Sequence, residues 1–579
     1  MPDCGFAGST LSCSPVNDNR NHAGKIASPL IACSLLALAV RMTAWWLLQS
    51  SVMLTPPSGG GHDRSLYVAA MERVADGVWW PDGSFDYLPL YPWLGGLATR
   101  LTGNPVAAAA ALGIALDTLT TALILLFALR LGAPRNLAAL AACLYAAYPL
   151  ATIYSLQPMP NTLNAFGITV FAGLIHAQWT ATRPRPIVTA LTGLFGGVFA
   201  LGFAGLLPMA AAAAAALAWR HRSILPALAL LAGFALPLTP VAVHNTRAEG
   251  RLTLLSTHGG LNLYMGNHRD ATGYPLRIRD FRMTARDLLA DAHRHAEQQA
   301  GRTLTRAESS AWWSGQARTF WREEPALGVY LTARKLLLFW NHREMDDLRL
   351  LEQIRLTDPA FRAWHGTPFA VFAWAGLIGL LYARNAAAPR LLVLTGLIGL
   401  VLFFITARYR LTFVPLLSVL GAAGLPVWWA HVTARRWRHL ATGALCAAVV
   451  AVPFKVRDQR PIDHYNAAIM LSQAGRQEEA GAVIEQGLVL APGFGELYFA
   501  LGNVLFQQEH FLEAASSFER ALALNPNQPT AGFNLVLSLA KAGEVCAARD
   551  AAATIAGMGL AVDARLDGLR RELDAACPR

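Results

Sequence analysis

The residues best suited to chemistry are a carboxylate, Asp63, and a cationic corner, Arg408-Tyr409-Arg410, that lie far apart in the sequence. A carboxylate beside a bound hydroxyl group can act as a general base. Two guanidinium groups next to an apolar run are costly unless water or an anion holds them, and they could stabilise the charge of a departing phosphate. A plainer interpretation of Asp63 is a helix N-cap, which is a common use of Asp.

A second polar stretch, residues 244–267, begins directly after an apolar run. It contains Arg247, a Gly-Gly turn, and the side chains of Tyr264 and Asn267. Such donors bind sugars and phosphates, so this stretch could contribute to a substrate site. The alternatives are an arginine that anchors the chain to lipid headgroups and glycines that serve an ordinary turn. The histidines here have no HExxH spacing, so we interpret them as polar loop residues.

Residues 333–347 join an apolar, Trp-containing run to a run of charges. This pattern predicts a helix that lies at a membrane surface. Lys335, Arg343 and Glu344 could face a site or water, and water is the usual surrounding of a charge run.

The composition favours a membrane protein with a soluble part. Of the 579 residues, 54% are hydrophobic and 15% are charged, which is too apolar for one soluble domain. The formal net charge of +11 comes almost entirely from arginines. Most of these arginines lie in loops between apolar runs, so membrane topology explains the charge better than nucleic-acid binding does.

The apolar runs predict about eleven transmembrane spans. If the N-terminal tail 1–26 is inside, each predicted inside loop carries at least two arginines, as the positive-inside rule requires. The same orientation places the loops 50–105 and 244–367, the Arg408–Arg410 corner and everything after 455 outside. The predicted spans are about 27–49, 106–130, 136–152, 162–180, 187–203, 204–219, 223–243, 368–384, 390–407, 411–430 and 438–454.

Residues 461–562 have a different character, because a 34-residue period places Leu, Ala and Pro at matching positions. This period predicts a tetratricopeptide array of two good repeats and a degenerate third, which would bind a protein partner or serve as a spacer. Residues 563–579 would be a tail. Cys546 and Cys577 could pair if exported, although two free thiols is the favoured interpretation, and no cysteine pair has metal-ligand spacing.

Taken in order, several segments resemble membrane glycosyltransferases of the GT-C fold, a group that includes protein O-mannosyltransferases and lipid A aminoarabinose transferases. The resemblance covers roughly residues 27–455. Its features are Asp63 with Tyr67 and the following PLYPW (89–93), the HNTRAEG and GGLNLYMGN motifs, KLLLFWNHRE, and FFITARYRLTFVPLL.

The resemblance implies a chemistry for these residues. A polyprenyl-phosphate sugar would be the donor, Asp63 would deprotonate an acceptor hydroxyl, and Arg408 and Arg410 would stabilise the departing lipid phosphate. Tyr409, Arg247, Asp86, Tyr264 and Asn267 would complete the substrate site. No cofactor is implied, and a divalent metal ion at Asp63 is left open. The protein would lie in a bacterial inner membrane, with its catalytic loops and repeats on the extracytoplasmic side.

One departure from the family pattern concerns acid–base chemistry. Many relatives carry an acidic residue after the third span, where this chain has Asn161. Asp82, Asp86 or a group on the substrate would then have to replace the missing carboxylate.

We therefore expect an all-α polytopic membrane protein with a C-terminal tetratricopeptide solenoid. The expected function is transfer of a sugar from a polyprenyl-phosphate donor to an extracytoplasmic protein, lipid or glycan. The alternative is a non-catalytic membrane scaffold for cell-envelope glycan assembly that recruits partners through the repeats. A transporter would instead show internal repeats and charges buried within spans. Arg41 is the main charge within a predicted span, and we expect its side chain to reach toward the membrane surface.

Overall fold

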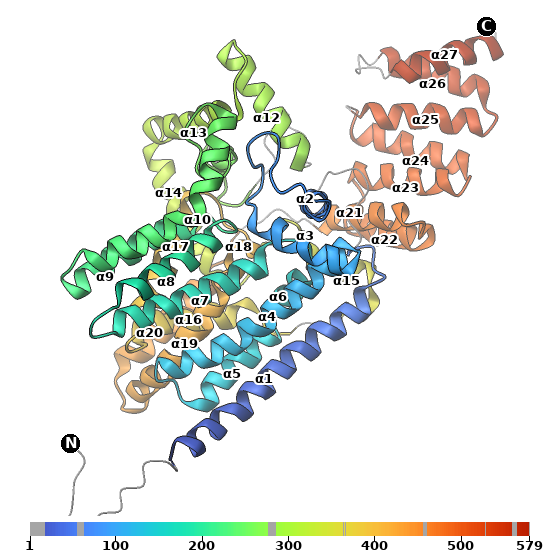
Figure 1. The fold of residues 1–579 in the computed structure, drawn as a ribbon. Helices are drawn as coiled ribbons and strands as arrows, with labels where there is room; N and C mark the ends of the chain where they lie inside the picture. The colour runs from blue at the N-terminus through green and yellow to red at the C-terminus, as the bar shows by residue number, and fades with distance from the viewer. Residues whose placement is uncertain are drawn as a thin grey trace, which may run out of the picture.

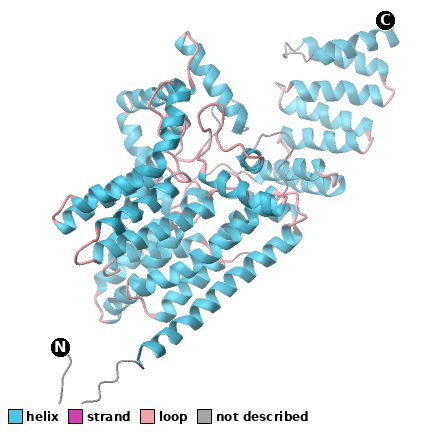
Figure 2. Cartoon of the chain, in the orientation of Figure 1, coloured by secondary structure: helices cyan, strands magenta, loops and turns pink. Residues whose placement is uncertain are grey.

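The computed structural model describes residues 18–54, 63–275, 285–362, 364, 366–454, 460–526, 528–557 and 564–577. Every regular element within these residues is a helix, as the sequence predicts (Figure 2). A helical bundle and a stack of helix pairs make up the chain, with α2 and α3 lying at the end of the bundle that faces the stack (Figure 1).

The bundle contains the long apolar runs of the sequence. Glycines allow α8 and α10 to cross closely, because a Cβ at Gly193 or Gly233 would lie about 2 Å from a carbonyl oxygen of the other helix. The bundle helices are α1 (Asp18–Leu48), α4 (Pro105–Arg130), α5 (Arg135–Ala146), α6 (Pro149–Leu156), α7 (Asn161–Thr180), α8 (Pro186–Ala200), α9 (Leu206–His221), α10 (Leu225–Glu249), α16 (Phe369–Tyr382), α17 (Ala387–Leu402), α18 (Ala407–Leu411), α19 (Val414–Thr433) and α20 (Trp437–Ala451).

Four described helices, α1, α4, α10 and α19, are long and apolar enough to cross a membrane. The number rises to five if α5 and α6, which meet at an angle of 54°, count as one broken span. These helices are consistent with a membrane protein, and the count of eleven spans stays a prediction. Helix α1 begins at Asp18, inside the predicted N-terminal tail, whose residues 1–17 lie outside the described part.

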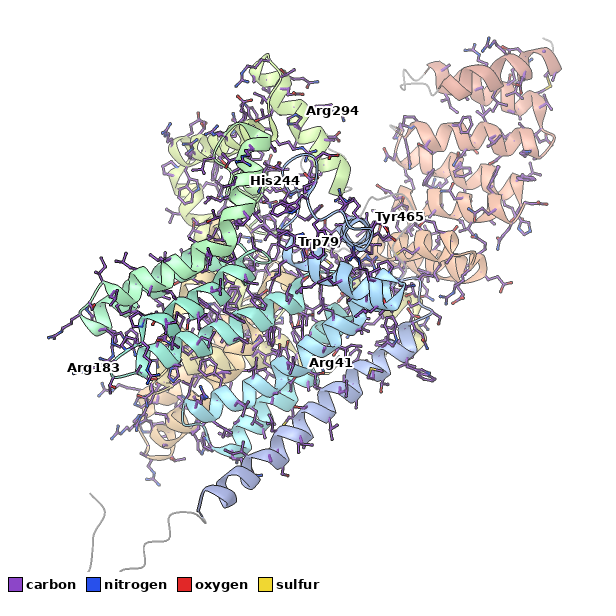
Figure 3. All side chains as sticks on the ribbon, in the orientation of Figure 1. Arg41, Trp79, Arg183, His244, Arg294 and Tyr465 are labelled. Atoms are coloured by element: carbon purple, nitrogen blue, oxygen red, sulfur yellow. A yellow bond between two sulfur atoms is a disulfide. The ribbon has the colours of Figure 1, made fainter. Side chains whose placement is uncertain are left out.

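A buried ion pair joins three bundle helices. Arg41 of α1, labelled in Figure 3, donates to Asp117 of α4 through Nε at 2.5 Å and also to the carbonyl of Ala146. Asp117 accepts a further bond from the Tyr145 hydroxyl at 2.6 Å. The expectation that Arg41 reaches the membrane surface is wrong, because its side chain is fully buried and its charge is matched inside the bundle.

Shorter helices form the connections that cover one end of the bundle. Each of these helices whose burial is described packs one face inward, and α3 and α14 also carry exposed apolar side chains on the opposite face. They are α2 (Asp63–Ala75), α3 (Leu90–Thr102), α11 (Gly259–Gly266), α12 (Ala285–Ala300), α13 (Arg306–Glu323), α14 (Pro325–Trp340) and α15 (Leu350–Thr357).

The helix stack contains the predicted repeats as consecutive antiparallel pairs, followed by a single helix (Figure 1). Residues 564–576 form this last helix, so most of the predicted C-terminal tail is ordered. A disulfide between Cys546 and Cys577 links this last helix to the preceding helix pair. The interpretation of these cysteines as two free thiols is therefore wrong. The helices are α21 (Arg460–Gln473), α22 (Gln477–Leu490), α23 (Gly495–Gln507), α24 (Phe511–Leu524), α25 (Pro529–Lys541), α26 (Val545–Gly557) and α27 (Ala564–Ala576).

The stack is docked on the bundle through its first pair. Arg349, just before α15, donates through Nε at 2.8 Å and Nη2 at 2.5 Å to the two carboxylate oxygens of Asp463 in α21. Asp463 is 3% exposed, so this bidentate pair is largely removed from water. Arg476 adds a bond from Nη2 to the Thr357 carbonyl at 3.4 Å.

Candidate functional site

Asp63 is the first residue of α2, so its carboxylate lies in the first turn of the helix. The helix is fixed by its buried face, where Tyr67 packs edge-on against Tyr91 of α3 at 5.6 Å between ring centroids. Tyr67 also contacts the Tyr87 ring at 5.0 Å. This aromatic packing holds the start of α2, and with it the Asp63 carboxylate, against the end of the bundle.

The corner that carries Arg408 is a short helix, α18, that breaks the path between α17 and α19. The Thr406 side chain caps it by accepting from the Tyr409 N–H. The Asn161 amide donates to the Arg408 carbonyl at 3.0 Å, which ties the corner to the start of α7. An ionised carboxylate at position 161 could not donate this bond, so Asn161 supports the corner as an amide.

A backbone bond brings a third segment to the corner. The Ala407 N–H donates to the Met345 carbonyl at 2.8 Å, which sets residues 345–347 beside Arg408. Arg408 then bridges two carboxylates: its Nη1 lies 2.8 Å from Asp63 and its Nη2 lies 2.7 Å from Asp347. Asp63 and Arg408, 345 residues apart in the chain, therefore meet at this corner.

This arrangement is partly buried and has spare hydrogen-bonding capacity. The side chains of Arg408, Asp347 and Asp63 are 13%, 15% and 24% exposed. Arg408 Nε and Asp347 Oδ1 have no partner among the described residues. A ligand that offers an acceptor and a donor could satisfy both atoms.

The pKa of Asp347 is raised from 3.8 to about 6, mainly by burial. The charge of Arg408 opposes this rise, and the charges of Asp346 and Asp63 contribute to it. Asp346 is 1% exposed and accepts from the Tyr154 hydroxyl at 2.6 Å and the Leu350 N–H at 2.9 Å. The site therefore holds one carboxylate that can take up a proton close to neutral pH.

Arg410 occupies a different environment from Arg408. Its side chain is 1% exposed, and its guanidinium lies 4.0 Å from the centroid of the Phe369 ring. Nη1 and Nη2 donate to backbone carbonyls, the shortest bonds being 2.7 Å to Asn341 and 2.6 Å to Arg343. Nη1 and Nη2 thereby hold the 338–343 backbone in place, and Nε is the guanidinium nitrogen of Arg410 that has no partner among the described residues.

The charge run at 343–347 faces water only in part: Arg343 is exposed as expected, whereas Glu344, Asp346 and Asp347 are turned inward. Lys335 is fully buried, and its Nζ donates to the Asn267 amide oxygen at 3.2 Å. Burial lowers the pKa of Lys335 to about 8. Glu344 accepts from the Tyr148 hydroxyl at 2.8 Å, and burial raises its pKa to about 7.

A second polar group lies next to the aromatic residues around Asp63. Asp86 is half exposed and forms an ion pair with Arg306, and His258 Nε2 lies 4.0 Å from the same carboxylate. The His258 ring packs edge-on against Tyr87 at 5.6 Å, and burial lowers the pKa of His258. Asp86 thus lies near the candidate site but does not contact Arg408, so Asp347, and not Asp86, supplies the second carboxylate there.

The remaining predicted site residues differ in how close they lie to the Asp63–Arg408 pair. Tyr409 lies under Arg408, whose Cζ is 5.2 Å from the ring centroid, and it shares an apolar cluster with Tyr264. Asn267 is buried, and its amide nitrogen donates to the carbonyls of Leu263 and Leu402, both at 2.7 Å, so it has a structural role. Arg247 is exposed on the last turn of α10, and the described residues give it no contact with the Asp63–Arg408 pair.

Sequence reasoning missed Asp346 and Asp347 as members of the site. The available signal was their position just after KLLLFWNHRE, a motif on which the resemblance rests. We expected a solvated charge run, whereas the backbone bond to Ala407 turns this segment inward. Among the described residues, no group of three or more His, Cys, Asp or Glu side chains could hold a metal ion.

Comparison with known proteins identifies one part of the chain. Residues 495–528, which contain α23 and α24, match the family model of the tetratricopeptide repeat. No curated protein matches the chain. The helix stack therefore contains a tetratricopeptide repeat, a fold that generally mediates protein–protein interaction.

Proposed function

We propose that this protein is a GT-C-type glycosyltransferase that moves a sugar from a polyprenyl-phosphate donor to an extracytoplasmic acceptor. The observation that carries the proposal is the bridge from Asp63 through Arg408 to Asp347. It supplies a base and a cation at one partly buried place, which is what the transfer requires.

The bridge suggests how the reaction would proceed. The donor phosphate competes for Arg408, and this releases the Asp63 carboxylate. Asp63 accepts the proton of the acceptor hydroxyl as that oxygen forms a bond to the anomeric carbon. The bond from the anomeric carbon to the phosphate oxygen breaks, its electron pair stays on that oxygen, and Arg408 stabilises the resulting charge.

Asp347 has a separate role in this proposal. Its raised pKa allows it to become neutral when the anionic donor arrives, which lowers the repulsion between carboxylate and phosphate. In the structure Arg408 is shared by two carboxylates, so a donor phosphate would otherwise enter a site with excess negative charge.

We place the catalytic loops and the repeats on the extracytoplasmic side of a bacterial plasma membrane. The arginine distribution favours this orientation. The disulfide between Cys546 and Cys577 supports it independently, because disulfides persist mainly in oxidising compartments.

A non-catalytic scaffold is the second candidate. The tetratricopeptide repeat and its docking on the segment that carries Asp347 favour this role, since Arg349 contacts the repeats two residues after Asp347. In the enzyme, the same docking would hold a protein partner or acceptor beside the site.

The test is the release of polyprenyl phosphate from radiolabelled polyprenyl-phosphate sugars by the full chain in liposomes. Asp63→Asn should lower the rate at least about 100-fold, the usual contribution of a general base. Asp76→Asn is the matched control, because Asp76 is an exposed aspartate just after α2 and its replacement should leave the rate unchanged. Equal rates in the wild type and Asp63→Asn, or loss of cellular function only on removal of the repeats, would favour the scaffold.

A further inference from the structure

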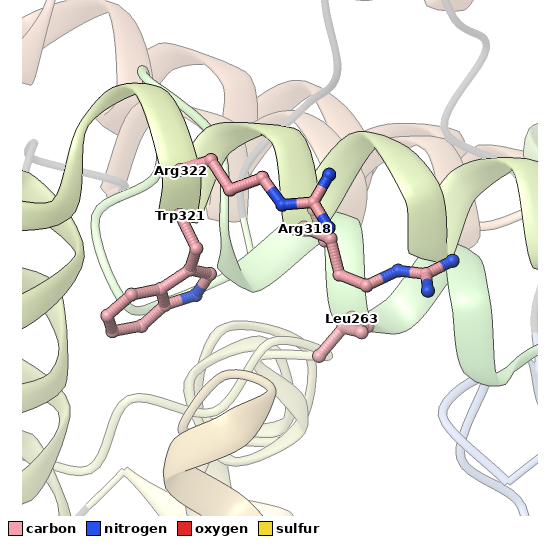
Figure 4. A pocket seen from close by; sticks show the side chains of 5 residues that line it. Leu263, Arg318, Trp321 and Arg322 are labelled. Carbon is pink, nitrogen blue, oxygen red and sulfur yellow. The ribbon is translucent and has the colours of Figure 1, made fainter.

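A pocket of about 300 Å³ lies between α11 and α13, on residues that the proposed mechanism does not use. Leu263, Ala317, Arg318, Trp321 and Arg322 line it (Figure 4). Its volume is at the lower end of the range for small-ligand sites.

Two unneutralised cations dominate the pocket. Arg318 and Arg322 are both exposed and lie one helical turn apart, where like charges repel each other. The described residues give neither of them a carboxylate partner, and the neighbouring Glu324 pairs with Arg269 at 2.5 Å. An anion bound between the two guanidinium groups would relieve this repulsion.

The indole of Trp321 forms a fixed wall of the pocket. Its Nε1 donates to the Asn267 amide oxygen at 3.1 Å, and its ring lies against Gly328 of α14, where a Cβ would come within 2.7 Å of it. The same Asn267 oxygen accepts from Lys335, so a buried cation lies behind the indole. The pocket thus combines an aromatic wall with positive charge at its mouth and behind it.

An exposed apolar face continues from the pocket along α14. Val329, Tyr330 and Leu336 are 63%, 56% and 39% exposed, although the opposite side of the helix packs into the bundle. Exposed apolar side chains next to Trp, Tyr and Arg are typical of the boundary between lipid headgroups and acyl chains.

We propose that the pocket binds the phosphate of an anionic phospholipid headgroup, with the acyl chains of that lipid lying along the exposed face of α14. Charge complementarity selects the anionic headgroup, and the apolar face selects a lipid over a soluble anion. This site is separate from the Asp63–Arg408 centre, so it stands whether or not the protein is a glycosyltransferase.

The test is native mass spectrometry of the full chain in neutral detergent with phosphatidylglycerol or phosphatidylcholine of the same acyl chains. The wild type should retain phosphatidylglycerol preferentially. Each arginine near an anionic lipid contributes about a fivefold preference, so R318Q/R322Q should reduce the preference about 30-fold. The control variant R251Q/R294Q removes the same charge from exposed positions elsewhere and should keep the wild-type preference for phosphatidylglycerol.

Three results would overturn the proposal. The first is an unchanged lipid preference in R318Q/R322Q, and the second is an equal loss in R251Q/R294Q. The third is displacement of phosphatidylglycerol by equimolar inorganic phosphate or polyprenyl phosphate, which would show that the pocket recognises another source of phosphate.

Discussion

Replacing Arg408 with Gln should destabilise the protein strongly, and more at high pH than at low pH. Arg408 is the shared cation between Asp63 and Asp347, and all three side chains are less than one-quarter exposed. The variant leaves two carboxylates facing each other without a counter-charge. Removal of one partner from such a buried ion pair costs about 3–5 kcal/mol.

The pH dependence follows from Asp347. In the wild type its folded pKa is about 6, above its ordinary value of 3.8. A raised carboxyl pKa gives stability that is fully present below pH 3.8 and is lost as the pH rises through about 6, by about 3 kcal/mol in all. Without Arg408, which lowers this pKa, the folded value rises further, and the loss extends above pH 6.

The assay is the midpoint of thermal unfolding in neutral detergent at pH 5 and pH 8, followed by tryptophan fluorescence. The difference in midpoint between the wild type and Arg408→Gln should be larger at pH 8 than at pH 5. The double variant R408Q/D347N should recover most of the midpoint that Arg408→Gln loses. Arg269→Gln removes an arginine from the exposed pair with Glu324 and should change little at either pH. An equal gap at both pH values, or no recovery in the double variant, would refute the reasoning.

Three further predictions concern the architecture. Arg349→Ala removes the bidentate ion pair with the buried Asp463, so hydrogen exchange of the α21 amides should accelerate on the order of 100-fold. Unchanged exchange would mean that this ion pair does not contribute to the docking of the repeats. Cys577→Ser removes the disulfide that closes a loop of 31 residues, so the local stability of α27 should fall by about 3–4 kcal/mol, measured by hydrogen exchange. Adding a reductant should not change the hydrogen exchange of this variant. Arg41→Ala should lower the midpoint of thermal unfolding, because the charge of Asp117 then lacks its counter-charge inside the bundle. The double variant R41A/D117L should recover the midpoint, whereas an unchanged midpoint in Arg41→Ala would contradict a role for the ion pair in stability.

Several features follow from sequence patterns because their causes are local. The 34-residue period predicts pairs of helices, since each repeat must place small residues where its helices pack, and the family match confirms one repeat at residues 495–528. The start of α2 follows from Asp63 and the apolar spacing behind it. The positive-inside rule predicts that Asp63 and Arg408 lie at the same face of the membrane, and the two side chains are in contact at one end of the bundle.

Other features depend on contacts that no local pattern encodes. Arg408 and Arg410 look equivalent in the sequence, yet one is bridged by carboxylates and the other by backbone carbonyls. The position of Asp347 depends on a backbone bond between segments about 60 residues apart. The pairing of Arg41 with Asp117 likewise requires two helices to lie side by side at a particular rotation.

The central claim is that Asp63 and Arg408 act as one unit on a lipid-linked sugar. The direct measurement is the rate of polyprenyl phosphate release by Asp63→Asn, by Arg408→Lys and by the double variant. Arg408→Lys keeps the positive charge but loses the two guanidinium nitrogens that reach two carboxylates at once. Each single variant should be slow, and the double variant no slower than the worse single one, as expected for residues that work together. Multiplied defects in the double variant, or an Asp63→Asn protein as fast as the wild type, would contradict the account.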